Sequence, residues 1–409
     1  MEYAEGASAA GRVGQIVIAG AGYAGLHVAL RLTAKLRNNP MVELTLVDRH
    51  DYHQALTELP RVAAGTRAAD AVRVPLHDVL AERVRFVQAE ITGFDLAGRR
   101  VLTGEGPIGW RWLVLALGSR PNDFAIPGLA ERALSLYSAS DAERVWVAVN
   151  KTLEDAAAAT DPERQRCLAT MVVGGGGATG VELAGELAEK LPEMASAVGL
   201  AVDRPAVLLV EAGPTILAGS SRQLIDKATG ILSELGVQVR TNAPIAAATD
   251  EGFRLTDGEL VEGGVFVWAG GVKAPELVVD SGLPTGYNGR VKVDQHLRVL
   301  DHPEIYVAGD LASVVDPRSG HVLPALAQVA LEEGETVARN LDAELEGRRL
   351  EEFTFHDKGF VVSVGPSRGV ADIAGITTGG RLAHVLKDAI EWEYRQSVRH
   401  LRGWSPVSR

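Results

Sequence analysis

One local pattern occurs twice in the chain, and this repetition constrains the fold more than any other feature of the sequence. In the first copy, the apolar run 15–19 leads directly into Gly20-Ala21-Gly22-Tyr23-Ala24-Gly25. Apolar residues at helical spacing follow (26–36), and a second β-branched run (42–47) ends at Asp48. This order predicts a buried strand, a glycine turn, a helix and a second parallel strand with an acid at its carboxyl end.

The same order returns in the middle of the chain. Residues 170–173 lead into Gly175-Gly176-Gly177-Ala178-Thr179-Gly180, and a helix is expected over 181–191, closed by Pro192. The next apolar run, 206–210, ends at Glu211. Two such units predict an α/β fold with two Rossmann-like dinucleotide-binding domains.

Glycine is needed in such a turn for three separate reasons. The first glycine permits the tight turn, the second lets a pyrophosphate approach the backbone, and the third lets the helix pack closely on the strand. The turn then presents backbone N–H groups and the positive helix end to the phosphates. Asp48 and Glu211 are expected to accept hydrogen bonds from ribose hydroxyls, and the charge of Glu211 favours NADH over NADPH.

Further apolar runs are expected to complete the two sheets. Residues 112–118 and 265–270 both end in small residues, and a long helix is expected over 325–345. The run 304–310 ends at Gly309-Asp310. In a chain with two nucleotide-binding units, this carboxylate suits the ribityl chain of FAD.

Composition excludes several other classes of protein. The chain has 409 residues and a net charge of −12, which argues against a nucleic-acid partner because a phosphate backbone requires a basic face. Its one cysteine, Cys167, excludes an internal disulfide and a redox-active cysteine pair. The histidines show no metal-ligand spacing, so no metal is expected. No apolar stretch reaches 18 residues, so no membrane-spanning helix is expected.

Taken in order, these motifs resemble the two-dinucleotide-domain flavoproteins, and among them the type II NADH dehydrogenases, the single-subunit NADH:quinone oxidoreductases. The narrower likeness depends on residues 180–187, 324–334 and 353–359, and the resemblance extends from residue 15 to about 394. It implies an NADH domain nested in an FAD domain. The expected limits are 13–135 and 273–345 for the FAD domain, 136–272 for the NADH domain and 346–409 for a C-terminal segment of strands and an amphipathic helix.

The resemblance also implies which residues hold the nucleotides. FAD would contact the first glycine turn and nearby strand ends: Gly20, Gly22, Tyr23, Ala24, Gly25, Asp48, Ile91, Ala116, Gly118, Asp310, Ala327 and Gln328. NADH would contact the second turn and its surroundings: Gly175, Gly177, Ala178, Thr179, Gly180, Glu211 and Gly271. NADH would stack on one face of the flavin, and a membrane quinone would enter from the opposite side.

Three catalytic residues are implied in the same way: Glu182, Gln328 and Glu332. The residue matching Glu182 lies near nicotinamide and flavin in the family, and the one matching Gln328 lies by the flavin and quinone. With Gln328 and Glu332, Lys387 and Ile390 would line the quinone pocket. Glu332 departs from the family pattern, which has glutamine there. It is either buried, with a raised pKa that suits proton donation to reduced quinone, or it faces solvent.

The C-terminal residues differ in charge from the rest of the chain. Residues 381–409 contain six Lys or Arg and three Asp or Glu, a net charge of +3. A run of apolar residues at three- and four-residue steps marks one face of a helix: Leu386, Ile390, Tyr394, Val398 and Leu401. Such a basic amphipathic helix predicts peripheral binding to the cytoplasmic face of the membrane. Packing against another domain or in a homodimer of a cytoplasmic protein is the open alternative.

The implied reaction is oxidation of NADH by FAD followed by two-electron reduction of a quinone, without proton pumping. Two alternatives remain open from the sequence. The first is an NADH-dependent reductase of a small electron-carrier protein or of oxygen, and a carrier reductase would need a basic docking face beside the flavin. The second is an NADH-sensing flavoprotein with little turnover.

Overall fold

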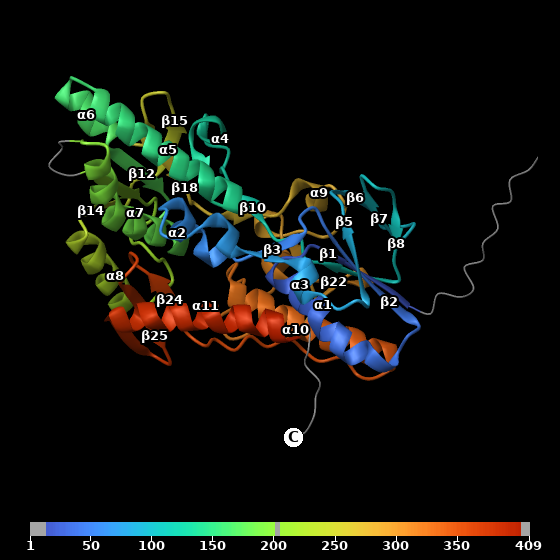
Figure 1. Cartoon of the computed structure of the whole chain (residues 1–409). Coiled ribbons are helices and arrows are strands. Elements are labelled where there is room, and N and C mark those ends of the chain that lie inside the picture. The colour runs from blue at the N-terminus through green and yellow to red at the C-terminus, as the bar shows by residue number, and fades with distance from the viewer. Residues whose placement is uncertain (1–13, 201–204, 402–409) are drawn as a thin grey trace, which may run out of the picture.

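The computed structural model describes residues 14–200 and 205–401. The chain forms two lobes that lie side by side, each built on a sheet of mainly parallel strands with helices on its faces (Figure 1). A smaller C-terminal part lies across both lobes. This arrangement confirms the α/β architecture predicted from the two repeated patterns.

The first lobe contains the first glycine turn and a six-stranded sheet. Strand β1 lies inside the sheet and all of its residues are buried, in keeping with its unbroken apolar sequence. Helices α1 (Tyr23–Lys35) and α10 (Ala327–Leu345) pack against each other beside this sheet. In sheet order the strands are β21 (Arg298–Val299), β22 (His302–Val307), β9 (Trp112–Leu115), β1 (Gly14–Ala19), β2 (Val42–Asp48) and β5 (Val84–Gln88).

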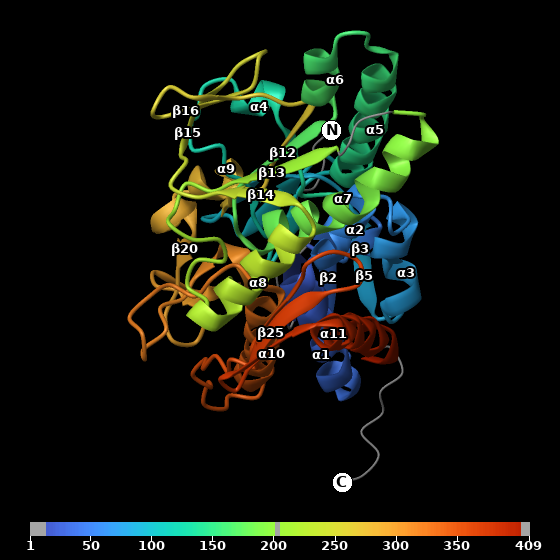
Figure 2. The ribbon, with the colours of Figure 1, turned by 90° about the vertical axis from the view of Figure 1, so that its left-hand side faces the viewer.

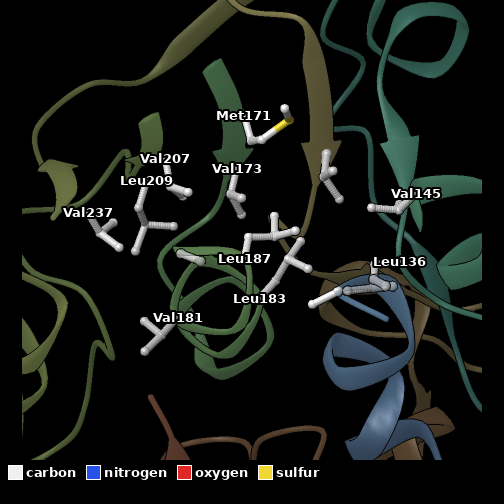
Figure 3. Close-up of a cluster of buried hydrophobic side chains, with 14 of the residues drawn as sticks. Leu136, Val145, Met171, Val173, Val181, Leu183, Leu187, Val207, Leu209 and Val237 are labelled. Atoms are coloured by element: carbon white, nitrogen blue, oxygen red, sulfur yellow. The ribbon is translucent and has the colours of Figure 1, made fainter. Parts of the chain in front are cut away.

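The second lobe contains the second glycine turn and five parallel strands. Helices α5 (Ala139–Ala158) and α7 (Ala178–Ala197) cover this sheet. Figure 3 shows Leu183 and Leu187 of α7 reaching toward Val173 in the core of this lobe. In sheet order the strands are β11 (Leu134–Ser135), β18 (Val265–Trp268), β12 (Thr170–Gly174), β13 (Ala206–Val210) and β14 (Val237–Arg240).

The chain crosses between the lobes twice, and the two crossings lie together. Strand β10 (Arg120–Pro121) leads toward the second lobe through α4 (Leu129–Arg132), and β19 (Val272–Lys273) leads back. These two strands pair with each other in an antiparallel ribbon. The expected domain limits at 135/136 and 272/273 fall near these crossings and remain predictions.

The other helices and strands are short or peripheral. They are β3 (Tyr52–Gln54), α2 (Leu59–Ala63), β4 (Arg73–Pro75), α3 (Leu76–Val79), β6 (Ile91–Asp95), β7 (Arg100–Thr103), β8 (Ile108–Gly109), α6 (Pro162–Leu168), α8 (Arg222–Glu234), β15 (Ile245–Ala248), β16 (Phe253–Leu255), β17 (Leu260–Val261), α9 (Glu276–Val279), β20 (Val291–Lys292) and β23 (Ala312–Ser313). Among them, α2 contacts both α5 and α7 and so connects the first lobe to the second.

Helix α7 does not end where the sequence predicted. Pro192 was expected to close the helix, but α7 continues through it to Ala197. A proline inside a helix removes one hydrogen bond and costs about 3 kcal/mol. The last turn is nevertheless retained because Met194 and Ala195 are buried in the core of the second lobe.

The C-terminal part consists of an antiparallel sheet and one long helix, α11 (Arg381–Leu401). The strands are β24 (Phe360–Ser363), β25 (Gly369–Ile373) and β26 (Ile376–Gly380). Residues 353–359, one of the stretches on which the family likeness depends, are in no regular element. Helix α11 lies beneath both lobes, beside α1 (Figures 1 and 2). No helix in the described part of the chain is long and apolar enough to cross a bilayer.

Candidate functional site

The first glycine turn has the geometry that a dinucleotide requires. Gly20 has a φ of +104°, and a Cβ on Gly25 would lie 1.9 Å from the carbonyl oxygen of Gly20. Apart from its two chain neighbours, no described residue has an atom within 4 Å of a Cβ built on Gly22. The Asp48 carboxylate accepts the Ala21 N–H group at 2.7 Å. The turn thus offers a backbone cradle to phosphate, with an acid at its edge.

The second glycine turn repeats this geometry closely. Gly175 has a φ of +110°, and a Cβ on Gly180 would lie 1.9 Å from the Gly175 carbonyl oxygen. Space near Gly177 is likewise open within the described residues. Glu211 accepts the N–H groups of Gly176 and Gly213, each at 2.6 Å. Both oxygens of this carboxylate are therefore fixed at the mouth of the turn.

The other residues expected to contact FAD lie at the ends of strands in the first lobe. Ser119 donates a hydrogen bond to Asp310 at 2.7 Å, and burial raises the pKa of the Asp310 carboxyl group. Ala116 is buried after β9, and Gly118 has a φ of +67°. Ile91, at the start of β6, is buried in the apolar core of the lobe.

Gly271, expected to contact NADH, lies at the return crossing between the lobes, with a φ of +125°. Its carbonyl accepts the N–H group of Asn122, which comes just after β10. The return crossing is therefore fixed to the outgoing one at this residue.

Glu182 lies where α7, β24 and α11 meet. Its carboxylate is buried, accepts the Ser363 N–H group at 3.1 Å and is hydrogen-bonded to the Lys387 ammonium group. Lys387 is also buried, and its Nζ lies 3.7 Å from the Glu391 carboxylate. The structure thus joins two of the residues expected in the site, although they are far apart in sequence. Ile390 lies on the outward side of α11, 47% exposed.

Gln328 and Glu332 bind the same loop from the first turns of α10, which begins at Ala327. Gln328 donates to the His356 carbonyl oxygen at 2.9 Å, and Glu332 accepts the His356 N–H group at 3.0 Å. The Lys358 ammonium group lies 3.4 Å from the Glu332 carboxylate. Glu332 therefore fits neither expected environment: its side chain is 18% exposed and ion-paired.

Comparison with known proteins decides the family. The model of the pyridine nucleotide-disulphide oxidoreductase family matches residues 14–334. A type II NADH:quinone oxidoreductase from Staphylococcus aureus is 33% identical over 383 residues, covering 92% of this chain and 94% of the relative. The chain belongs to the type II NADH:quinone oxidoreductases. Membership confirms the resemblance, fold class, enzyme class and cofactors, FAD and NADH, predicted from the sequence.

Solved structures show the same fold as this type II oxidoreductase. NDH2 from Plasmodium falciparum, in complex with NADH, superposes with a TM-score of 0.83 at 17% identity, covering 96% of this chain and 97% of that one. The sulfide:quinone oxidoreductase from Aquifex aeolicus superposes with a TM-score of 0.77 at 18% identity, covering 95% and 92%.

A buried ionic group beside Glu182 was not identified from the sequence. Arg61 of α2 lies 2.7 Å from Asp388, 3.5 Å from Glu391 and 3.8 Å from Glu186. Burial raises the pKa values of Glu186 and Glu391. The four-residue spacing of acids and bases along α7 and α11 was the available signal, since such residues share a helix face.

Glu333 was also not identified from the sequence, in which nothing distinguishes it from its neighbour Glu332. The Glu333 side chain is completely buried and accepts the Gly309 N–H group at 2.6 Å, directly beside Asp310. Burial raises its pKa to about 8, against the opposing effects of that N–H group and of Arg290. A neutral carboxyl group therefore supports the turn that carries the expected FAD carboxylate.

Proposed function

We propose that this chain oxidises NADH with a bound flavin and passes two electrons to a membrane quinone. The observation that carries the proposal is family membership over nearly the whole chain, together with two glycine turns of matching geometry. Bound FAD supplies the hydride and electron chemistry, and the protein supplies binding, orientation and electrostatics. FAD is assigned to the first turn and NADH to the second.

The two turns fit nucleotides of this kind. Each offers backbone N–H groups at a helix N-terminus, which suits a pyrophosphate. Asp48 and Glu211 stand where ribose hydroxyls would be recognised, and Asp310 stands where the ribityl chain of FAD would lie. The fixed carboxylate of Glu211 repels a 2′-phosphate, so NADH is assigned in preference to NADPH.

Glu182 and Lys387 are proposed to serve the acceptor side of the flavin. The Lys387 ammonium group can donate a proton at Nζ, and the Glu182 carboxylate can hold one at an oxygen atom within the same hydrogen bond. Gln328 and Glu332 are proposed to border the quinone, and they fix the loop around His356. The ion pair with Lys358 favours a positioning role for Glu332 over proton donation.

Anaerobic spectroscopy of the purified protein tests this function. We expect a yellow protein that NADH bleaches and that regains its colour when menadione or a ubiquinone analogue is added. Rapid reoxidation by ferredoxin or oxygen with no response to quinone would favour the carrier-reductase or oxidase alternative. Fast bleaching followed by slow reoxidation with every acceptor would favour a sensor, and a protein that binds no FAD would contradict the proposal.

Helix α11 is proposed to lie on the cytoplasmic face of the membrane, in an orientation that the sequence did not predict. Tyr394 and Val398 belong to the apolar face that was expected to meet the membrane or, in the open alternative, another domain, and both face the protein body. The outward side instead exposes Leu382, Val385 and Trp392, which are 69%, 61% and 65% exposed. A helix that turns an apolar face outward needs an apolar partner.

The attraction of α11 to the membrane is assigned to apolar contact more than to charge. Lys387 and Arg395, two of its basic residues, turn inward and pair with Glu182 and Glu58. They cannot interact with anionic lipid while these pairs persist. A second copy of the chain is the other partner that could cover the same apolar side.

A further inference from the structure

The peptide between Ala21 and Gly22 is fixed from one side by a histidine. The carbonyl oxygen of Ala21 lies 3.0 Å from Nδ1 of His53, which belongs to β3 and is completely buried. In a planar trans peptide, the C=O and N–H groups point in opposite directions. Holding the Ala21 carbonyl therefore aims the Gly22 N–H group away from His53. This direction leaves the N–H group available to the pyrophosphate that the turn is proposed to bind.

The hydrogen bonds define which nitrogen of the His53 ring carries the proton. A carbonyl oxygen can only accept, so Nδ1 must carry the proton. Burial lowers the pKa of His53 to about 4, and the ring is therefore neutral at physiological pH. Its other nitrogen, Nε2, must then accept, and it lies 2.8 Å from the hydroxyl group of Tyr394. The hydrogen bonds thus run from Tyr394 to His53 and from His53 to Ala21.

Tyr394 belongs to α11, so the C-terminal helix reaches the first glycine turn. The Tyr23 ring, in that turn, packs 5.1 Å from the His53 ring and 4.9 Å from the Tyr394 ring, measured between centroids. Helix α11 lies beside α1, the helix that follows the turn (Figure 2). The C-terminal helix is therefore in contact with the proposed flavin site.

The second turn provides an internal comparison. Gly176 occupies the position of Ala21: its N–H group is accepted by Glu211 as that of Ala21 is accepted by Asp48. Its carbonyl oxygen also receives a hydrogen bond, at 2.8 Å, but from the backbone N–H group of Leu217. Leu217 has a φ of +49°, an unfavourable conformation for leucine. The equivalent carbonyl groups of the two turns are thus held by unrelated donors, the His53 ring in the first and the Leu217 N–H group in the second.

We propose that His53 and Tyr394 are positioning residues of the FAD site. His53 holds the Ala21 carbonyl group so that the Gly22 N–H group faces the FAD pyrophosphate, and Tyr394 holds the His53 ring in the required tautomer. The C-terminal helix thereby completes the flavin site, whereas the NADH turn is held within its own lobe by Leu217. This inference rests on the proposed assignment of FAD to the first turn.

The variant Tyr394→Phe tests the inference, because it removes one hydroxyl group and keeps the aromatic packing. We expect FAD to dissociate about five- to tenfold faster, as for the loss of one buried hydrogen bond. FAD release is followed by the rise of its fluorescence after dilution. The ³¹P NMR signals of the bound pyrophosphate should also shift. The matched control is Tyr306→Phe, which removes a buried tyrosine hydroxyl of the same lobe that bonds to Glu344.

Variants of His53 provide the second arm of the test. His53→Asn retains an amide donor near the position of Nδ1 and should hold FAD better than His53→Ala. The affinity for NAD⁺ should stay unchanged in every variant, because Leu217 holds the second turn. If Tyr394→Phe and the control release FAD equally and give the wild-type ³¹P spectrum, the inference is wrong. If the wild-type protein takes up no FAD, the proposed function fails instead.

Discussion

The ionisation of Glu333 should change the stability of the fold with pH. Its pKa is raised by burial to about 8 in the fold, from an ordinary value of 4.5, with Arg290 and Asp310 as its charged neighbours. The folded state therefore retains a proton that the unfolded chain releases above about pH 4.5. The contribution of this proton to the free energy of unfolding is fully present below that pH and is lost as the pH rises toward 8.

Glu333→Gln removes this dependence because the amide remains neutral and still accepts the Gly309 N–H group. We expect the melting temperature of the wild-type protein to fall relative to that of the variant between pH 5 and 8.5. Thermal unfolding of both FAD-saturated proteins across this range measures the difference. Parallel pH profiles would show that Glu333 does not titrate there.

Glu182 and Lys387 should behave as one unit. Removing one partner of a buried ion pair leaves an uncompensated charge and costs about 3–5 kcal/mol, whereas replacing both costs much less. Glu182→Gln and Lys387→Met should each lower the free energy of unfolding and slow quinone reduction. The double variant should be more stable than the sum of the single effects predicts. Urea unfolding of all four proteins measures the coupling, and additive effects would refute it.

At the level of residues, the glycine turns could be predicted from sequence because their requirements are local. Gly20 and Gly175 have positive φ, and the third glycine of each turn has no room for a Cβ. Glu332 and Glu333 could not be distinguished in the same way. Neighbouring residues differ by about 100° around a helix, so their burial depends on how α10 packs against the sheet. Tertiary contacts determine which side of α10 faces the core.

At the level of elements, α11 depends on charged contacts with its neighbours. Arg61 of α2 contacts Asp388 and Glu391 of α11 and also Glu186 of α7. Arg61→Met would leave the Glu186 and Glu391 carboxylates buried without this cation, at a cost of about 3–5 kcal/mol. We therefore expect a large fall in the free energy of unfolding, measured by urea titration.

Arg73→Met is the matched control for Arg61→Met. Arg73 also lies in the first lobe and pairs with two acids, Asp70 and Glu143, but both of these acids are exposed. Exposed ion pairs contribute about 1 kcal/mol or less, so this variant should be nearly neutral. Equal losses in the two variants would contradict the argument that the buried carboxylates require Arg61.

The orientation of α11 shows why the elements themselves were easier to predict than their packing. Apolar spacing indicated a helix, and a helix is present. Its apolar stripe includes Tyr394, and the sequence left open whether this face meets the membrane or the protein; Tyr394 turns inward together with Lys387 and Arg395. The inward face is polar because the helix packs against Glu58, Arg61 and Glu182, which come from distant parts of the chain. Periodicity within one segment contains no information about such partners.

For the whole molecule, the outward face of α11 should determine where the protein resides. Replacing Leu382, Val385 and Trp392 by serine removes exposed apolar area and leaves the inward ion pairs intact. We expect the wild-type protein to float with liposomes and the triple variant to stay in solution. Because Lys387 and Arg395 turn inward, flotation should depend only weakly on the fraction of anionic lipid.

Val147→Ser controls for the loss of exposed apolar area as such. Val147 lies on α5 in the second lobe and is 64% exposed, so its replacement should leave flotation unchanged.

The oligomeric state distinguishes the two partners that could cover the outward face of α11, a membrane and a second copy of the chain. A wild-type dimer that does not bind liposomes, and that the triple variant converts to a monomer, would assign this face to a second copy. Since the inner side of α11 bears Tyr394, membrane binding that stabilises this helix should also slow FAD release.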